Sequence, residues 1–156
     1  MLARPASLPA KVRQVLEARL AQLSGDARAV IELASVVGRN FSYNILAQAS
    51  DMPEDLLVAC LDECWRRRII REQGGGAYDF SHDKLREVAY AGLSRTRRRW
   101  LHGRVASAMQ VVHGGDLARV AGVIAGHYEA AGQPAQALAG HRSEPAAQGH
   151  STQEET

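Results

Sequence analysis

The sequence predicts a mainly α-helical fold, in which short helices are followed by one β-hairpin and then by further helices. Apolar residues recur at the three- and four-residue steps of a helix through most of the chain. Only the segment "RIIREQGGGAYDFS", residues 68–81, changes to strand-like alternation around a glycine turn. Helices followed by one hairpin are typical of a winged helix, a variant of the helix-turn-helix. Because a lone hairpin is marginally stable in water, we expect it to pack on the helices.

Length and composition limit the other possibilities. A chain of 156 residues has room for one domain of ordinary size, and 46% hydrophobic residues can supply one packed core. The sequence contains no apolar run long enough to cross a membrane, and its first residues lack the apolar stretch of a signal peptide. We therefore expect a cytoplasmic protein without a membrane partner.

The first half of the chain predicts short helices with clear boundaries. The first helix, over residues 9–23, has an apolar face made of Val12, Val15, Leu16, Leu20 and Leu23. Ser24 is the expected N-cap of a second helix, which ends at Gly38 in the manner of a left-handed C-terminal residue. Ser42 begins a short third helix.

A fourth helix is predicted over residues 53–65, with Pro53 near its first position. Its inner face consists of Leu57, Cys60, Leu61 and Cys64. The spacing of the two cysteines puts both on one helix face, where they could ligate a metal. No further Cys/His pair at a suitable spacing completes a tetrahedral set, so small core residues are the favoured interpretation.

The hairpin and the helices after it complete the predicted fold. Gly74–Gly76 form the hairpin turn, and Tyr78 and Phe80, two residues apart, share one face of the second strand. Ser81 and Ser94 are the expected N-caps of the next two helices. A further helix runs from Asp116 to Gly132, and Pro134 starts another that carries Ala137 and Leu138. Residues 141–156 are polar and are expected to be disordered.

Charge is distributed unevenly along the chain. Residues 66–104 hold eleven Lys and Arg against four Asp and Glu, a net charge of +7 within a chain of net charge +2. The arginines form two clusters, Arg66, Arg67 and Arg68, and Arg95, Arg97, Arg98 and Arg99. The first cluster ends a helix, where the dipole favours cations, but the second opens one, where it does not. An acidic partner, nucleic-acid phosphate, or a solvated or intramolecular docking face would each explain this second cluster. The solvated or intramolecular docking face is favoured.

Direct reading of duplex DNA is disfavoured by the predicted fourth helix. In a winged helix this would be the recognition helix, and phosphate attraction supplies most of the affinity. Residues 53–65 carry no cation but include Glu54, Asp55, Asp62 and Glu63. The predicted wing tip is uncharged glycine.

The pair His82 and Asp83 stands where a strand is expected to give way to a helix. The pair, with Ser81, could simply satisfy the helix start, or the imidazole could donate a proton to an anion beside free backbone N–H groups. Asp83 complements the positive end of the helix and could orient the imidazole. Adjacent residues do not form a nucleophile–base–orienter array, so catalysis is excluded. His102, His113 and His127 lie on different segments, and no metal site is expected.

Three segments in order resemble one protein family. "FSHDKLREVAY" is similar to the region around the His-Asp motif in the winged-helix domain of STAND-class signal-transduction ATPases. These include NB-ARC proteins and the large ATP-binding bacterial transcriptional regulators. "LSRTRRRWLHGRVASAM" resembles the Arg-rich helix that follows in the bacterial regulators, and the segment from Leu8 to Ser50 resembles the entry to that domain. The resemblance covers roughly residues 8–140.

The end of the resemblance extends to a tetratricopeptide (TPR) repeat. Ile124, Ala125, Tyr128 and Ala137 occur at the family's spacing for the large, small, aromatic and small positions of one repeat. The pattern fails at His141, where the next aromatic residue is expected. Because one repeat cannot bury its own face, the array looks truncated and the chain looks like a fragment.

The resemblance implies three regions and a regulatory function. They are a winged-helix domain over residues 8–93, a helical extension with a partial TPR-like repeat over residues 94–140, and the tail over residues 141–156. In the parent family, His82 with Asp83 would contact a phosphate of ADP held by the ATPase core and stabilise the inactive state. The segment would couple the nucleotide state of that core to a helical TPR sensor array.

No enzymatic activity is expected of this chain. It contains no GxxxxGK[ST] phosphate loop, and no apolar strand ends in an aspartate that would hold magnesium. ADP and ATP are therefore implied for the parent family, whereas the chain alone is expected to bind no cofactor. Two other functions remain open: an autonomous winged-helix DNA-binding protein and a helical protein-interaction module.

Overall fold

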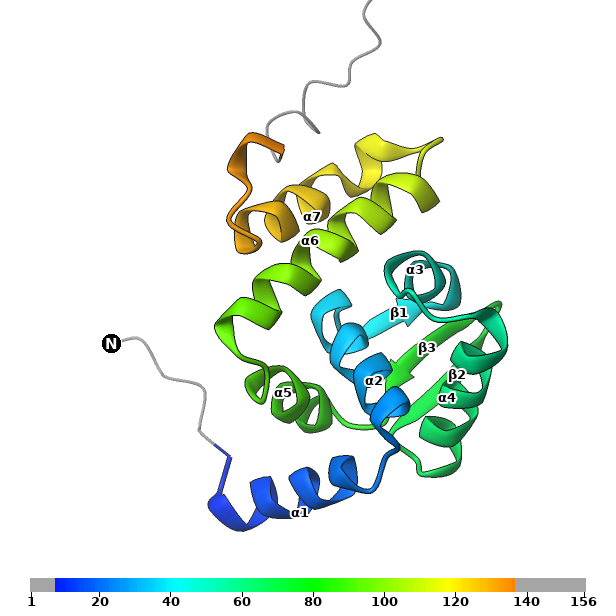
Figure 1. Ribbon diagram of the computed structural model, residues 1–156, viewed down its shortest axis with the longest axis vertical. Coiled ribbons are helices and arrows are strands. Elements are labelled where there is room, and N and C mark those ends of the chain that lie inside the picture. Colours follow the sequence, from blue (N-terminus) through cyan, green and yellow to red (C-terminus); the bar gives the residue numbers. More distant parts are fainter. Residues whose placement is uncertain (1–7, 137–156) are drawn as a thin grey trace, which may run out of the picture.

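The computed structural model describes residues 8–136 and shows a mainly helical protein with one small β-sheet (Figure 1). The mainly helical class is thus confirmed. The elements in order are α1 (Ala10–Ala21), α2 (Gly25–Val37), β1 (Asn40–Ser42), α3 (Tyr43–Ala49), α4 (Glu54–Arg66), β2 (Ile70–Gly74), β3 (Ala77–Phe80), α5 (Asp83–Ala91), α6 (Arg95–Val112) and α7 (Leu117–Ala130).

Three of the helix starts have the serine caps that the sequence predicts. The hydroxyl oxygens of Ser24, Ser42 and Ser94 accept hydrogen bonds from the backbone N–H three residues later, at 3.2, 3.2 and 3.1 Å. Each bond satisfies one of the donors that a helix leaves free in its first turn. Gly38 ends α2 with φ of +145°, a positive value that favours glycine, although it lies outside the left-handed helical region.

The sheet has one strand more than the predicted hairpin. β2 and β3 pair in antiparallel fashion around the turn Gly74–Gly76, as predicted, and β1 pairs with the other edge of β3, so the strand order is β1-β3-β2. The ring of Phe41 on β1 lies 5.9 Å from that of Tyr78 and 5.5 Å from that of Phe80. Tyr78 and Phe80 therefore share a face, as expected, and Phe41 joins them there.

The main core surrounds α2, which packs against α3, α4, α5 and α6 (Figure 1). Val30, Ile31 and Ala34 of this helix are almost completely buried. Cys60 and Cys64 of α4 are buried free thiols in the same core, so their interpretation as small core residues is confirmed. Burial raises the pKa of the Cys64 thiol to about 12, which keeps it protonated.

The first helix, α1, and the last helices, α6 and α7, differ in how much of their apolar surface is buried. On α1, Leu16 and Leu20 are buried, but Val12 and Val15 are 42% and 59% exposed, so the predicted apolar face was too wide. On α6, Leu101, Val105 and Ala108 belong to the main core, so residues on both sides of the predicted boundary at 93–94 share one core. A second, smaller cluster joins α6 to α7 through Ala106, Ile124, Ala125 and Tyr128.

Some predictions fall partly or wholly on residues outside the described range. Residues 134–136 are helical, in agreement with a helix starting at Pro134, but Ala137 and Leu138 lie beyond the described residues. The tail over residues 141–156 also lies outside them. Within residues 8–136, no helix combines the length and the apolar character that a membrane crossing needs.

Candidate functional site

A groove of about 610 Å³ opens where the end of α4, the start of β2 and the start of α5 meet, with α1 alongside. Its charged and aromatic lining consists of Arg19, Arg66, Arg68, Arg71, Trp65 and His82. No carboxylate lines it. The structure thus gathers residues from four segments, and it places His82 on the same surface as the first arginine cluster.

The backbone at the end of α4 forms a Schellman motif. The N–H of Arg68 donates to the carbonyl of Trp65 at 2.9 Å, and the N–H of Ile69 donates to that of Cys64 at 2.9 Å. Ile69 and Cys64 are both fully buried and supply the apolar contact that accompanies this motif. Arg68 occupies the left-handed position with φ of +58°, where glycine is the usual residue. The side chain of Arg68 lines the groove. The left-handed backbone conformation that places it there is unfavourable for a residue other than glycine.

Two side chains fix this turn in place. The carbonyl oxygen of Arg68 accepts a hydrogen bond from the hydroxyl of Ser81 at 2.6 Å and another from the guanidinium of Arg19 at 3.0 Å. The prediction that Ser81 caps α5 was therefore wrong, because its hydroxyl is bound to a carbonyl 13 residues earlier in the chain. The bond ties the start of α5 to the end of α4, and it holds His82 near Arg68.

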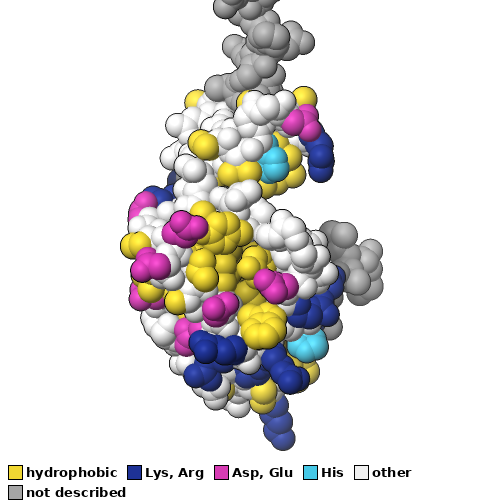
Figure 2. Space-filling view, turned by 90° about the vertical axis from the view of Figure 1, so that its right-hand side faces the viewer, with side chains coloured by type: hydrophobic (Ala, Val, Ile, Leu, Met, Phe, Trp, Pro, Cys, Tyr) yellow, Lys and Arg dark blue, Asp and Glu magenta, His cyan; other side chains and the backbone are white. Residues whose placement is uncertain are grey.

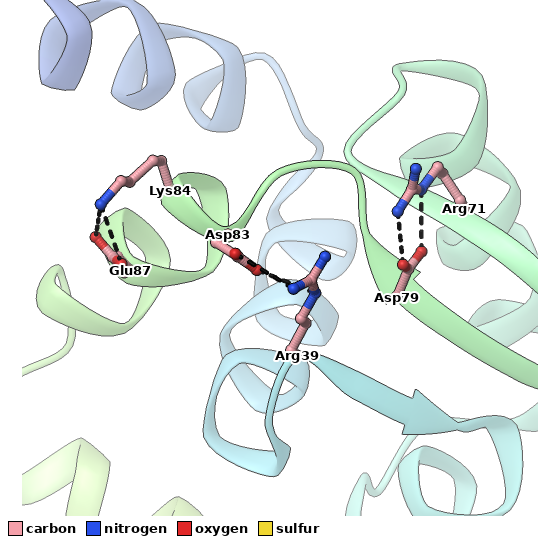
Figure 3. A network of polar contacts seen from close by, with 6 residues as sticks. All are labelled: Arg39, Arg71, Asp79, Asp83, Lys84 and Glu87. Atoms are coloured by element: carbon pink, nitrogen blue, oxygen red, sulfur yellow. Dashed lines mark hydrogen bonds and ion pairs between the residues drawn. The ribbon is translucent and has the colours of Figure 1, made fainter.

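His82 occupies the N-cap position of α5 and is exposed. Its backbone carbonyl accepts from the N–H of Leu85 at 3.0 Å, but its side chain makes no capping hydrogen bond. Asp83 does not orient the imidazole, because its carboxylate pairs with Arg39 at 3.0 Å (Figure 3). The helix start is thus completed without the imidazole, which remains available to a ligand.

The cations of the groove differ in whether they are neutralised. Arg71 forms a bidentate pair with Asp79 at 2.7 and 3.1 Å (Figure 3), and its hydrogen bonds lower the pKa of that buried carboxyl. Within the described part of the chain, Arg66 and Arg68 have no carboxylate partner. Figure 2 shows dark-blue side chains and a histidine gathered at the lower end of this face, below acidic side chains. The uncompensated positive charge of this groove therefore comes mainly from Arg66 and Arg68.

Two of the four arginines in the second cluster, Arg97 and Arg98, are engaged within the molecule. Arg98 donates to the carbonyls of Tyr90 and Ala91, both at 3.2 Å, and so satisfies the end of α5. Arg97 pairs with Glu32 of α2 at 3.3 Å. These contacts support the intramolecular docking interpretation and explain cations at a helix start, because the negative end of α5 lies next to it.

The structure brings together two histidines that the sequence places on separate segments. Nδ1 of His102 lies 2.8 Å from Nδ1 of His127, and Nε2 of His102 lies 2.9 Å from the hydroxyl of Tyr90. Burial is the main cause that lowers the pKa of His127 to about 4, so the pair is neutral at pH 7. Among residues 8–136, no group of three or more His, Cys, Asp or Glu is placed to hold a metal ion. The pair joins α6 to α7.

Comparison with known proteins gives one relative and no family. No protein-family model matches the chain, and no solved structure matches it. The chain is 32% identical over 128 residues to an uncharacterized protein of Rhizobium meliloti (strain 1021). The similarity covers 80% of this chain but only 12% of that protein.

Proposed function

We propose that this chain is the non-catalytic regulatory segment of a STAND-type ATPase or transcriptional regulator, with a winged-helix domain followed by a TPR-like helical pair. In the parent protein it would couple the nucleotide state of an ATPase core to a helical sensor array. The observation that carries the proposal is the exposed imidazole of His82 at the start of α5, which has no hydrogen-bond partner among residues 8–136 and lies in an arginine-lined groove.

The arrangement of the elements supports the winged-helix part. Helices α2, α3 and α4 pack together ahead of the β2–β3 hairpin, and the short β1 completes a three-stranded antiparallel sheet. This order and pairing support a winged helix, in which a helix-turn-helix is followed by a hairpin. The antiparallel contact of α6 with α7, through small and aromatic residues, is likewise compatible with one TPR-like pair.

The relative supports the view that such a segment works inside a longer chain. The Rhizobium protein is several times longer than its matched portion, since that portion is 12% of it. A regulatory lever requires neighbouring modules on which to act. The relative has the length to contain them.

The mechanism would be a rigid-body switch between two docked positions. In the closed state His82 donates a hydrogen bond to a phosphate of ADP held by the core, and release of this contact accompanies the active state. The bond from Ser81 to Arg68 makes the start of α5 move with the end of α4. The segment would then transmit its displacement as one body.

The test is a histidine substitution in the intact parent protein. His82→Ala should accelerate ADP release and raise basal activity, because the closed state loses one hydrogen bond to phosphate, a loss of about 1.5–3 kcal/mol. His113→Ala, at the end of α6, is the matched control and should release ADP at the wild-type rate. An ADP release rate unchanged by His82→Ala would remove this histidine from the mechanism.

A winged-helix protein that binds duplex DNA on its own is the second candidate from sequence. Exposed acidic residues on α4, namely Glu54, Asp55 and Asp62, weigh against it. A salt-dependent mobility shift of duplex DNA by this chain would favour that candidate instead.

A further inference from the structure

We infer that the groove at the end of α4 binds single-stranded nucleic acid without sequence preference, with one base stacked on Trp65 and the flanking phosphates on Arg66 and Arg68. The groove holds the two components that such sites combine, an exposed aromatic face and unpaired cations.

Trp65 supplies the stacking surface. It is 54% exposed although it follows the fully buried Cys64 on α4, so its indole lies over the groove instead of in the core. No aromatic partner or guanidinium covers this ring among the described residues. The other tryptophan, Trp100, differs in that the guanidinium groups of Arg97 and Arg104 lie over it. Trp65 is thus free to accept a base.

Arg66 and Arg68 supply the contacts to phosphate. They flank the end of α4 next to Trp65, and neither is neutralised by a carboxylate in the described part of the chain. Arg71, by contrast, is held by Asp79, and Arg19 is engaged with backbone carbonyls. The free cations therefore match two phosphates, one on each side of a stacked base.

The backbone of Arg68 indicates that its side chain is needed. A left-handed conformation is unfavourable for arginine, and glycine would complete the same Schellman motif without that cost. Ser81 and Arg19 both bind its carbonyl and hold the turn in this shape. The backbone of Arg68 is thus held in place before any ligand binds, and its side chain lies along the groove.

The openness of the groove favours a strand over a free nucleotide. Sites for small ligands enclose most of the ligand and read it with buried polar groups. Here the tryptophan and the arginines of the groove are exposed, apart from the half-buried Arg19, and no buried polar side chain points to where a base edge would lie. A surface of this kind recognises the π-face and the phosphate, which every nucleotide of a strand presents.

An acidic peptide would satisfy the arginines but not the indole. Carboxylates bring no flat apolar ring to cover a half-exposed tryptophan, whereas a base stacks on it. Three neighbouring cations, Arg71, Arg39 and Lys84, are already neutralised by Asp79, Asp83 and Glu87 (Figure 3). A short contact of one base and two phosphates fits the groove better than a long acidic segment.

The experiment uses this chain with Trp100→Phe, which leaves Trp65 as the one remaining tryptophan. Titration with an oligothymidylate of about ten nucleotides should quench its fluorescence. The logarithm of the binding constant should fall with the logarithm of salt concentration with a slope of about −1.4, because single strands contribute about −0.7 per phosphate.

Substitutions assign the contacts. Arg66→Gln and Arg68→Gly should each make the slope shallower by about 0.7, whereas Arg95→Gln, at the exposed start of α6, should leave it unchanged. Trp65→Ala, followed with a fluorescently labelled oligothymidylate, should weaken binding roughly 5- to 150-fold. Arg68→Gly tests the contact without risk to the fold, because glycine suits that position.

Three results would overturn the inference. They are no quenching by the oligonucleotide, equal quenching by poly-glutamate at the same charge concentration, and competition by ADP at concentrations no higher than the oligonucleotide. The inference concerns the same groove as the proposed function but needs no ATPase core. A negative oligonucleotide titration of this chain would not change the expected effect of His82→Ala on ADP release. A negative ADP-release result would likewise not change the expected oligonucleotide binding.

Discussion

At the scale of single residues, Arg68 has an unfavourable backbone conformation that singles it out as a candidate functional residue. Its φ of +58° places a long cationic side chain where helices usually end in glycine. The sequence "RRRII" contains no glycine, so a left-handed residue at this point could not be predicted from it. Burial of Ile69 demands the turn, because that side chain must reach the core immediately after α4 ends.

Arg68→Gly should therefore stabilise the protein. Relief of the left-handed conformation gains about 1–2 kcal/mol, and the greater freedom of glycine in the unfolded chain removes about 0.5–1 kcal/mol of that gain. We expect the free energy of unfolding to rise by about 0.5–1 kcal/mol in urea titration. Arg66→Gly, two residues earlier at the last helical position of α4, is the control and should lower it; equal losses in both variants would contradict the assignment.

The pair His102 and His127 is a second feature that only the three-dimensional structure contains. The two rings come from α6 and α7, 25 positions apart, and their Nδ1 atoms lie at hydrogen-bonding distance, 2.8 Å apart. Arg86 is a further positive group that lowers both pKa values, after burial. Protonation of both rings is therefore unfavourable in the folded state.

Acid should weaken the contact between α6 and α7. The pKa of His127 is about 4 when folded and about 6.5 when unfolded, so the unfolded chain binds more protons between these values. Its contribution to stability is complete above pH 6.5 and is lost as the pH falls towards 4. We expect a decrease of about 2 kcal/mol in the free energy of unfolding over that interval.

The measurement compares His127→Gln with the wild type at each pH, which cancels the contribution of other groups. The variant should lose most of the pH dependence between pH 6.5 and 4.5. His113→Gln, at the C-cap of α6, should keep it. A wild-type pH profile in His127→Gln would show that the pair does not control acid stability.

At the scale of elements, helix ends are completed by side chains from other helices. Ser24 caps α2 and also donates its hydroxyl to Glu63 of α4 at 2.7 Å, and its N–H donates to the same carboxylate at 3.0 Å. These bonds are the main cause that lowers the pKa of Glu63. The sequence predicts that Ser24 caps α2, but it does not predict that Glu63 of α4 would accept hydrogen bonds from Ser24.

Ser24→Ala should lower the free energy of unfolding by more than the loss of an ordinary N-cap does. We expect a loss of about 2 kcal/mol in the free energy of unfolding, because both the cap and a charge-assisted hydrogen bond disappear. Ser94→Ala removes a cap that touches no carboxylate and should cost about 1 kcal/mol. Equal losses in urea titrations of the two variants would show that the bond to Glu63 adds nothing.

The missed strand β1 has a related explanation. Asn40–Ser42 is three residues long and carries no alternating pattern, so sequence periodicity gives no sign of it. It is a strand because β3 offers a free edge and because Phe41 stacks on Tyr78. Pairing with a segment nearly 40 residues away, not local preference, determines this element.

At the scale of the whole molecule, α6 belongs to two cores of unequal size. Leu101, Val105 and Ala108 lie in the main core around α2, whereas Ala106 meets α7 in a cluster of four buried residues. A small cluster stabilises its helix less than a large one does. α7 should therefore open more readily than the rest of the fold.

Native-state hydrogen exchange tests this arrangement. Amides of α7 should exchange faster than those of α2, and Ile124→Ala should accelerate exchange in α7 while leaving α2 unchanged. Ile31→Ala, in the centre of the main core, should lower the opening free energy of the helices packed around α2 by about 2–5 kcal/mol. Equal acceleration of α2 by Ile124→Ala would show one cooperative unit.

The sequence by itself determined the helices, the hairpin, the serine caps of α2, α3 and α6, and the burial of the cysteines. It did so because these features follow from periodicity, turn chemistry and capping within a few residues. It also singled out His82 and the two arginine clusters as residues in need of an explanation.

Only the tertiary structure decided which groups those residues contact. It directed Ser81 to the carbonyl of Arg68, paired Asp83 with Arg39, engaged Arg97 and Arg98 inside the molecule, and left Arg66, Arg68 and His82 around one groove. The physical reason is that the partner of a polar group is chosen by distance in space. Distance along the chain does not determine it once segments far apart are packed together.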